Sequence, residues 1–320
     1  MDALSDVLRA AHLTGGVFLH AEFTAPWCVV IRATPQMCAP FLGKTAHLIP
    51  YHYVVEGNPF VAVEGAEPER LRSGDVVLFP RNHHHVLGSD LALEPVFGRD
   101  VILPPEGSGL YTIRHGGGGA PTRMICGYLG CDQAYGNPVI ATLPPIMRIK
   151  VDDAGPSEWI RSTFQYAANE VASGRPGSQT VLAKISELLF VEAVRRHVEE
   201  LPASETGWLA GLRDAVVARA LALMHADIGR DWSVDDLGRE AGLSRSALAE
   251  RFTRIIGMAP MHYLAHWRMQ VAAQKLKDTS ASLAQIAETV GYESEAAFSR
   301  AFKKNFGTAP ATWRRTANES

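Results

Sequence analysis

Two segments in the C-terminal third of the chain repeat the same order of apolar, polar and glycine positions. The paired positions are separated by 50 residues: Ser244 and Ser294, Leu248 and Phe298, Phe252 and Phe302, Gly257 and Gly307, Pro260 and Pro310. Before the turn the separation is 49, since the second copy carries one extra residue there. A repeat of this kind indicates one structural unit that occurs twice.

Each copy of the repeat predicts a helix-turn-helix. A short helix, 234–241 in the first copy and 283–290 in the second, ends at a glycine, which tolerates the left-handed backbone of a sharp turn. The serine that follows stands where its hydroxyl can cap the next helix. Apolar residues four positions apart bury one face of that next helix, and its opposite face is free to enter a major groove of DNA. Gly257 and Gly307 are predicted to end these two recognition helices.

A single helix is predicted between the two copies, over residues 260–277, with a proline near its start. Its 18 residues correspond to a length of about 27 Å. A stiff spacer of that order can hold two recognition helices about one DNA turn apart, roughly 34 Å. One chain is therefore expected to contact two successive major grooves.

The N-terminal part, from about residue 17 to 150, has the pattern of a β structure. Short runs rich in β-branched and aromatic residues alternate with turn signals, at 29–31, 53–55, 60–63, 76–79 and 124–126. Many short strands at this spacing indicate a barrel or jelly roll. The glycine run 116–119 has no partner lysine and no GxGxxG context, so we interpret it as a flexible loop rather than a phosphate cradle.

From about residue 155 the apolar period becomes helical, with one helix around Trp159–Ala167 and another around Val181–Val198. Two interpretations stay open: an exposed apolar stripe that pairs two subunits, or two helices that simply cover the barrel. Leu201–Gly207 is the best linker candidate. The predicted architecture is α+β and multidomain, with a cupin-like β-barrel at 1–150, a helical linker at 151–207 and an all-α double helix-turn-helix domain at 208–320.

Bulk composition fits a globular protein, with 47% hydrophobic and 20% charged residues. The net charge of −3 averages two unlike parts: residues 210–320 hold 15 Lys and Arg against 12 Asp and Glu, and residues 1–209 hold 16 against 22. DNA phosphate binding must therefore rely on placement and helix N-termini more than on a global field. No apolar run reaches about 18 residues and no leader is visible, so we expect no membrane contact and a cytoplasmic protein.

Four cysteines, Cys28, Cys38, Cys126 and Cys131, are too sparse for a disulfide scaffold. Cys126 and Cys131 are five positions apart, which is not a standard zinc-knuckle spacing. We expect all four to be reduced thiols in the core.

The C-terminal region resembles the AraC/XylS family of bacterial transcription regulators over residues 208–320. The resemblance is carried by Gly242–Pro260, Trp267-Arg268-Met269, Ile286-Ala287, Gly291–Ser294 and Phe298–Lys303. It implies a seven-helix domain that binds double-stranded DNA, with RNA polymerase as a further partner. It also implies base contacts, in the first unit from Arg245, Ser246, Ala249 and Glu250, and in the second from Glu295, Ala296, Ser299 and Arg300.

Among these residues Arg300 is the strongest candidate, since arginine reads guanine in bidentate fashion; a phosphate contact is the alternative. Glu250 departs from the basic residue of several relatives. It can accept from a cytosine amino group or pair with Arg254 on the next turn. Phosphate contacts, or otherwise a solvated face, are expected at Arg268, Lys303 and Lys304.

Two N-terminal stretches resemble cupin motifs, His52–Gly57 in degraded form and Gly74–His85. Such domains in AraC-type regulators sense a small effector or mediate subunit contacts. Asn82 stands where the second motif has glycine, and asparagine tolerates a left-handed turn. A divalent metal bound by His52, His85 and Cys126 is one hypothesis. The first motif lacks its H-x-H pair and downstream glutamate, which favours a metal-free pocket.

Three functions follow as hypotheses. The first is a transcription regulator, preferably an activator, whose cupin domain binds a small effector or sets the geometry of a homodimer. The second is a cupin metalloenzyme with a DNA-binding appendage, which the sparse ligand set disfavours. The third is an architectural DNA-binding protein without an effector.

Overall fold

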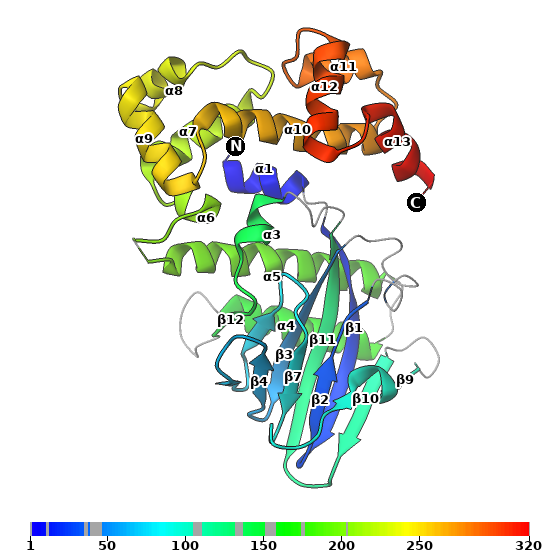
Figure 1. The fold of residues 1–320 in the computed structure, drawn as a ribbon. Coiled ribbons are helices and arrows are strands. Elements are labelled where there is room, and N and C mark those ends of the chain that lie inside the picture. Colours follow the sequence, from blue (N-terminus) through cyan, green and yellow to red (C-terminus); the bar gives the residue numbers. More distant parts are fainter. Residues whose placement is uncertain are drawn as a thin grey trace. The chain divides into compact units, whose positions relative to one another are not determined.

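The computed structural model describes residues 2–10, 13–34, 38, 47–104, 111–131, 137–150, 158–173, 177–202 and 204–319 (Figure 1). Contacts divide the chain into two compact units. The sheet unit comprises residues 12–134 and 143–197, and the helical unit comprises 1–11, 135–142 and 198–320. The helical unit is therefore built from three separate segments of the chain, whereas each predicted domain, 1–150, 151–207 and 208–320, is one continuous segment.

The strands of the sheet unit form two sheets. The seven-stranded sheet has the order β12-β6-β3-β11-β1-β10-β9, and the five-stranded sheet has the order β5-β4-β7-β2-β8. Their bounds are β1 Leu13–Thr24, β2 Cys28–Ile31, β3 His47–Glu56, β4 Phe60–Val63, β5 Glu69–Arg70, β6 Val76–Leu78, β7 His85–Gly88, β8 Val96–Phe97, β9 Ile102–Leu103, β10 Tyr111–Gly116, β11 Pro121–Cys131 and β12 Met147–Ile149. A 3-10 turn, Gly98–Asp100, follows β8. All five predicted strand runs lie in or overlap these strands.

The core of the sheet unit lies between the two sheets. Alternate residues of β1, such as Leu19, Ala21 and Phe23, join Val29 of β2 and Leu87 of β7 in one buried cluster. Within the described residues the strands form a double-sheet sandwich of the jelly-roll kind, one of the two arrangements that the strand spacing indicated. Period-two alternation predicts which face of a strand is buried, but not whether its sheet closes on itself.

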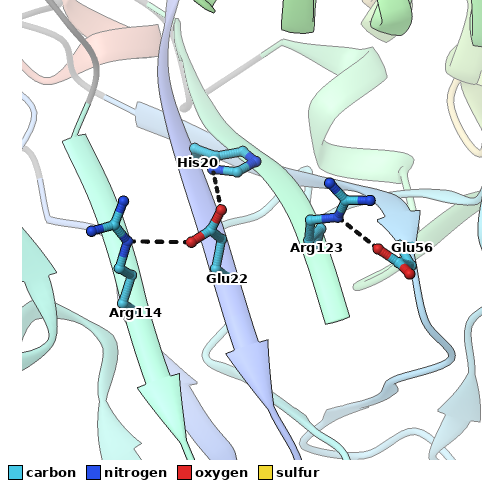
Figure 2. A network of polar contacts seen from close by, with 5 residues as sticks. All are labelled: His20, Glu22, Glu56, Arg114 and Arg123. Atoms are coloured by element: carbon cyan, nitrogen blue, oxygen red, sulfur yellow. Dashed lines mark hydrogen bonds and ion pairs between the residues drawn. The ribbon is translucent and has the colours of Figure 1, made fainter. Parts of the chain in front are cut away.

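The outer face of the larger sheet carries a row of alternating charges across four neighbouring strands (Figure 2). Arg114, Glu22, Arg123 and Glu56 are register partners in turn on β10, β1, β11 and β3. Arg114 Nε lies 3.2 Å from a Glu22 carboxylate oxygen, and Arg123 Nε lies 2.6 Å from a Glu56 oxygen. Exposed pairs of this kind contribute little stability each, but a one-residue slip would turn the side chains of a strand to the opposite face and break every pair, so the row favours one register.

The predicted glycine loop joins β10 to β11. Gly116 has φ of +139°, and a Cβ there would lie 1.9 Å from the Thr24 carbonyl oxygen, so only glycine fits. The Gly117 and Gly119 backbone N–H groups donate to the carbonyl oxygens of Thr24 and Ala25. The run is therefore a turn held against the start of the β1–β2 connection, and it forms no phosphate cradle.

Two helices, α4 (Glu158–Ser173) and α5 (Ser178–Glu200), pack on the larger sheet. Phe164 of α4 stacks on Tyr53 of β3, with ring centroids 4.1 Å apart. The Tyr51 hydroxyl and Ser186 Oγ of α5 are 2.9 Å apart. Both predicted helices are present, and each packs one side on the sheet. The alternative of subunit pairing concerns their other side and stays a prediction.

The helical unit contains the double helix-turn-helix. Its helices are α6 Trp208–Gly211, α7 Ala215–Ala226, α8 Val234–Ala241, α9 Arg245–Ile256, α10 Pro260–Asp278, α11 Leu283–Thr289, α12 Glu295–Phe306 and α13 Pro310–Glu319. Ser244 accepts a hydrogen bond from the Ala247 N–H, and Ser294 accepts one from Ala297, as predicted for N-caps. Gly257 and Gly307 end α9 and α12 in the left-handed conformation.

Two short helices from the N-terminal half belong to the helical unit. These are α1 (Ala3–Ala10), which precedes β1, and α3 (Pro138–Thr142), which follows β11. Helix α1 packs on α7, α3 packs on α6, and the two pack on each other. The Asn137 side chain caps α3 and donates to the Val7 carbonyl at 3.5 Å. The sequence pattern did not indicate this packing, because neither helix is long enough to show a period.

No helix in the described ranges is long and apolar enough to cross a membrane.

Candidate nucleic-acid interface and buried histidine cavity

The first recognition helix, α9, buries Leu248 and Phe252 and exposes its other side. Of its predicted base-contacting residues, three are exposed and one is half-buried: Arg245, Ser246 and Glu250 are exposed and Ala249 is half-buried. Arg245 Nη1 lies 3.5 Å from an Asp235 carboxylate oxygen on α8, in a pair that is mostly exposed. Among the described residues Glu250 has no ion pair with Arg254, so its carboxylate is available to a ligand.

The second recognition helix, α12, presents a matching face. Phe298 and Phe302 are fully buried, while Glu295, Ala296, Arg300, Lys303 and Lys304 are exposed and Ser299 is half-buried. The Arg300 guanidinium makes no hydrogen bond or ion pair with any residue that the structure describes. A long cation without a protein partner on the open face of a groove-sized helix can reach a base edge or a phosphate.

The structure gives Arg268 a role other than the predicted phosphate contact. Its guanidinium donates three hydrogen bonds to backbone carbonyls: Nε to Ile228 at 2.9 Å, Nη2 to Arg230 at 2.7 Å and Nη1 to Gly291 at 3.3 Å. Burial lowers the pKa of this guanidinium from its ordinary value. The sequence showed only a basic residue on a helix, and it could not show that the donors are used inside the protein.

A buried polar network stabilises the first half of the helical unit. The Tyr263 hydroxyl of α10 accepts from Trp208 Nε1 at 2.7 Å and lies 2.7 Å from His225 Nε2 on α7. The His225 ring stacks on Trp267, with centroids 4.3 Å apart. His225 Nδ1 is buried and has no partner among the described residues. Burial lowers the pKa of His225 to about 3, so the ring is neutral at pH 7.

In the sheet unit, His52 and His85 meet in the core between the two sheets. Their Nε2 atoms are 2.8 Å apart, and His85 Nδ1 lies 3.0 Å from the His83 carbonyl oxygen. A neutral His85 that donates from Nδ1 accepts at Nε2, so His52 carries its proton on Nε2 and its buried Nδ1 is a bare acceptor without a partner. Burial lowers the pKa of both rings, that of His85 to about 4. The preceding Asn82 adopts φ of +54°, as expected for its motif position.

The residues around this pair do not assemble a metal centre. Cys126 is the register partner of His52 on the neighbouring strand β11, so the two side chains are neighbours. No group of three or more His, Cys, Asp or Glu residues in the described part of the chain is arranged to hold a metal ion. Protein metal sites usually need three or four such ligands. Burial raises the pKa of the Cys126 thiol, so it is protonated at pH 7 in the protein as described.

All four cysteines are free and buried, which confirms their prediction as core thiols.

A small cavity lies beside the histidine pair. It is lined by His52, Cys126 and mostly apolar side chains, with Arg32 and Arg99 among the lining residues. Its volume of about 20 Å³ accommodates roughly one water molecule. A larger ligand would require the lining side chains or the two sheets to move apart.

A second, open depression follows the outer side of α4 and α5. It has a volume of about 610 Å³, and its lining includes Trp159, Tyr166, Val181, Ile185 and Leu188. Tyr166 and Leu188 are 48% and 50% exposed, and they are two of the four large apolar side chains that are exposed in the described residues. The α4–α5 groove, as we call these five residues, is thus an apolar surface on helices whose other side covers the sheet.

Two capped recognition helices with open polar faces, joined by one 19-residue helix, are the arrangement of a double helix-turn-helix domain that binds DNA. Comparisons with known proteins agree. A family described as "Cupin" matches residues 2–199, and one described as "Helix-turn-helix domain" matches residues 237–316.

Three relatives illustrate the similarity. A Streptomyces lividans protein described as an AraC-like transcription regulator is 35% identical over 98% of both chains. The RCS-specific HTH-type transcriptional activator RclR of Escherichia coli K12 is 25% identical over 98% of this chain and 97% of its own. A crystal structure of an AraC-type regulator from Chromobacterium violaceum is 31% identical over 34% of this chain and 96% of its own, with a TM-score of 0.32.

The chain belongs to the AraC-like transcription regulators that carry an N-terminal cupin domain. It is a DNA-binding transcription regulator, as the first hypothesis holds.

Proposed function

We propose that the protein activates transcription from operators with two half-sites, under the control of a small effector bound in the sheet unit. The observation that carries this proposal is the pair of recognition helices, α9 and α12, whose polar faces are exposed. Helix α10 lies between them in the chain, directly after α9 and one short helix before α12. RNA polymerase is the partner that an activator must contact, and the relative RclR is named an activator. Because chromosomal DNA is the ligand, we place the protein's action in the cytoplasm.

The proposed base contacts are those of the two exposed faces. Arg300 donates to a guanine through both arms of its guanidinium, and Glu250 accepts from a cytosine amino group, since it has no Arg254 partner in the described chain. Lys303 and Lys304 contact phosphates from the same helix as Arg300. Arg245 is proposed to contact the DNA from the start of α9. The remaining contacts are proposed at the shorter side chains of the two faces, which are Ser246, Ala249, Glu295, Ala296 and Ser299.

Effector control needs a route from the sheet unit to the DNA-binding helices, and the chain path supplies one. Strand β11 carries Cys126 in the cavity wall and leads through Asn137 to α3, and β1 is preceded by α1. Both helices pack inside the helical unit on α6 and α7. A small apolar effector that separates the sheets would shift β1 and β11, and so bias the position of α1 and α3.

Homodimer formation is proposed at the α4–α5 groove. In a two-fold dimer the same patch faces itself, so one apolar surface on each copy is buried by the other. The apolar side chains of the groove, set among Ser162, Thr163, Thr180 and Lys184, favour burial against a second copy.

The Leu188→Asp variant is expected to sediment as a monomer under conditions in which the wild type sediments as a dimer, because a carboxylate in the groove would be desolvated on association. Leu103→Asp is the matched control: Leu103 is 45% exposed on β9, outside the groove. Analytical ultracentrifugation measures both. A wild-type monomer, or loss of the dimer in the Leu103 variant as well, would refute the assignment.

The proposed function itself is tested by selection from random duplex DNA at about 150 mM salt, where non-specific binding is weak. Recovered fragments are expected to share two short motifs whose centres lie about 10–10.5 bp apart. A reporter behind a recovered site should then be transcribed more strongly when the protein is present. No enrichment over random duplex would end the proposal, and reduced transcription would make the protein a repressor.

A further inference from the structure

The two halves of the helical unit touch each other at a small backbone junction. The loop 228–230, between α7 and α8, belongs to the first half, and Gly291, in the turn between α11 and α12, belongs to the second. A Cβ on Gly291 would lie 2.6 Å from the Gly229 carbonyl oxygen, and one on Gly229 would lie 3.0 Å from the Thr289 carbonyl oxygen. Glycine on both sides therefore allows the two backbones to approach closely.

Arg268 joins the two sides of this junction. It lies in the middle of α10 and donates to the Ile228 and Arg230 carbonyls on one side and to the Gly291 carbonyl on the other. The planar guanidinium offers five donors in a fixed fork, so three carbonyls bound at once have a defined mutual position. A lysine has the same charge but no fork, and it could not hold all three in this geometry.

The junction lies close to both recognition helices along the chain. Gly291 is three residues before Ser294, the N-cap of α12, and loop 228–230 ends three residues before Ser233, the N-cap of α8, which leads directly into the turn and α9. Fixing the junction therefore fixes where α12 begins relative to the first helix-turn-helix. Stiffness of α10 alone sets only their approximate separation.

We propose that Arg268 is a positioning residue that sets the spacing and relative orientation of the two half-sites the protein accepts. The inference rests on the proposed two-site DNA reading and deepens it. With the junction closed, the two recognition helices form one rigid reader. With the junction open, they behave as two readers on a hinged α10 and tolerate DNA of other spacings.

The DNA test uses full-length protein and a selected operator, together with versions in which one base pair is added or removed between the half-sites. Each such change moves one half-site by about 3.4 Å and a tenth of a turn. The wild type is expected to lose at least about tenfold in affinity, because both halves no longer bind together. For Arg268→Lys the penalty should fall below about threefold, while affinity for the original spacing drops severalfold.

Arg268→Lys separates this role from a phosphate contact, since lysine keeps the charge that a phosphate contact needs. Arg219→Ala, an exposed residue of α7 with no hydrogen bond or ion pair in the described structure, controls for loss of a positive charge and should keep the wild-type penalty. Gly291→Ala opens the junction from the other side and is expected to behave as Arg268→Lys does. An unchanged spacing penalty in both junction variants would overturn the proposal.

A second measurement needs no DNA, so it distinguishes failure of this inference from failure of the proposed function. Spin labels are placed at Thr253→Cys on α9 and Lys304→Cys on α12, both exposed, while the four native cysteines are buried. Double electron–electron resonance should show one narrow distance in the wild type. Arg268→Lys should shift this distance or broaden it by about twofold, as expected for a freed hinge. The same narrow distribution in both proteins would overturn the proposal even if DNA binding is specific.

Discussion

Acidification from pH 7 to pH 5 is expected to lower the free energy of unfolding of the helical unit by about 2 kcal/mol through His225 alone. Burial lowers the pKa of His225 to about 3 from an ordinary value of 6.5. The unfolded chain therefore takes up a proton as the pH falls below about 6.5, while the folded protein does not until about pH 3. Because the unfolded state binds more protons throughout that window, stability rises with pH and is lost on acidification.

The surroundings of His225 explain why its neutral form is retained. Its ring lies between Tyr263 and Trp267 of α10, and Nε2 faces the Tyr263 hydroxyl. Burial raises the pKa of that hydroxyl, so no negative charge is available to stabilise an imidazolium. A proton on Nδ1 would also find no acceptor among the described residues, since that atom is buried without a partner.

Urea unfolding followed by tryptophan fluorescence measures this effect, because Trp208, Trp232, Trp267 and Trp313 lie in the helical unit and only Trp27 and Trp159 lie elsewhere. His225→Phe is the control: it keeps an aromatic ring to stack on Trp267 and removes the titrating group. The variant should lose about 2 kcal/mol less than the wild type between the two pH values. Equal losses in both proteins would assign the pH dependence to other groups.

The fold of the C-terminal region follows from its sequence to a large extent, because its signals are local. Glycine at Gly242, Gly257 and Gly307 and serine at Ser244 and Ser294 act within a few residues of their own positions, and each helix end they predict is observed. The buried faces follow from the four-residue spacing of apolar side chains. Local chemistry of this kind can be predicted without knowing what the rest of the chain does.

Long-range pairings could not be predicted in this way. Arg268 has the sequence context of an exposed basic residue, and only the approach of Ile228 and Gly291 turns it into a structural donor. His225 became significant only when α6 and α10 placed Trp208 and Tyr263 around it. In the sheet unit the cupin-like motifs correctly indicated that His52 and His85 lie together. The number of metal-ligating side chains around them depends on strands distant in sequence, and the motifs do not show it.

Replacement of Arg300 by alanine is expected to weaken binding to the selected operator by 1–3 kcal/mol, about 5- to 150-fold, because one bidentate contact to guanine is lost. The fold should not change, since Arg300 is exposed and has no partner in the described residues. Affinity for random duplex should fall by less than about threefold, because non-specific binding depends on phosphate contacts. Fluorescence anisotropy with both duplexes, over a series of salt concentrations, measures these quantities.

Lys304→Ala is the matched comparison, because Lys304 is an exposed cation on the same helix, α12, that is proposed to contact phosphate. Its loss should weaken operator and random duplex alike and reduce the slope of log affinity against log salt by about one. If Arg300→Ala behaves in that manner, Arg300 contacts phosphate. Replacing single guanines in the operator completes the test: at the guanine that Arg300 reads, base change and Arg300→Ala together should cost no more than either alone, since both remove the same two hydrogen bonds.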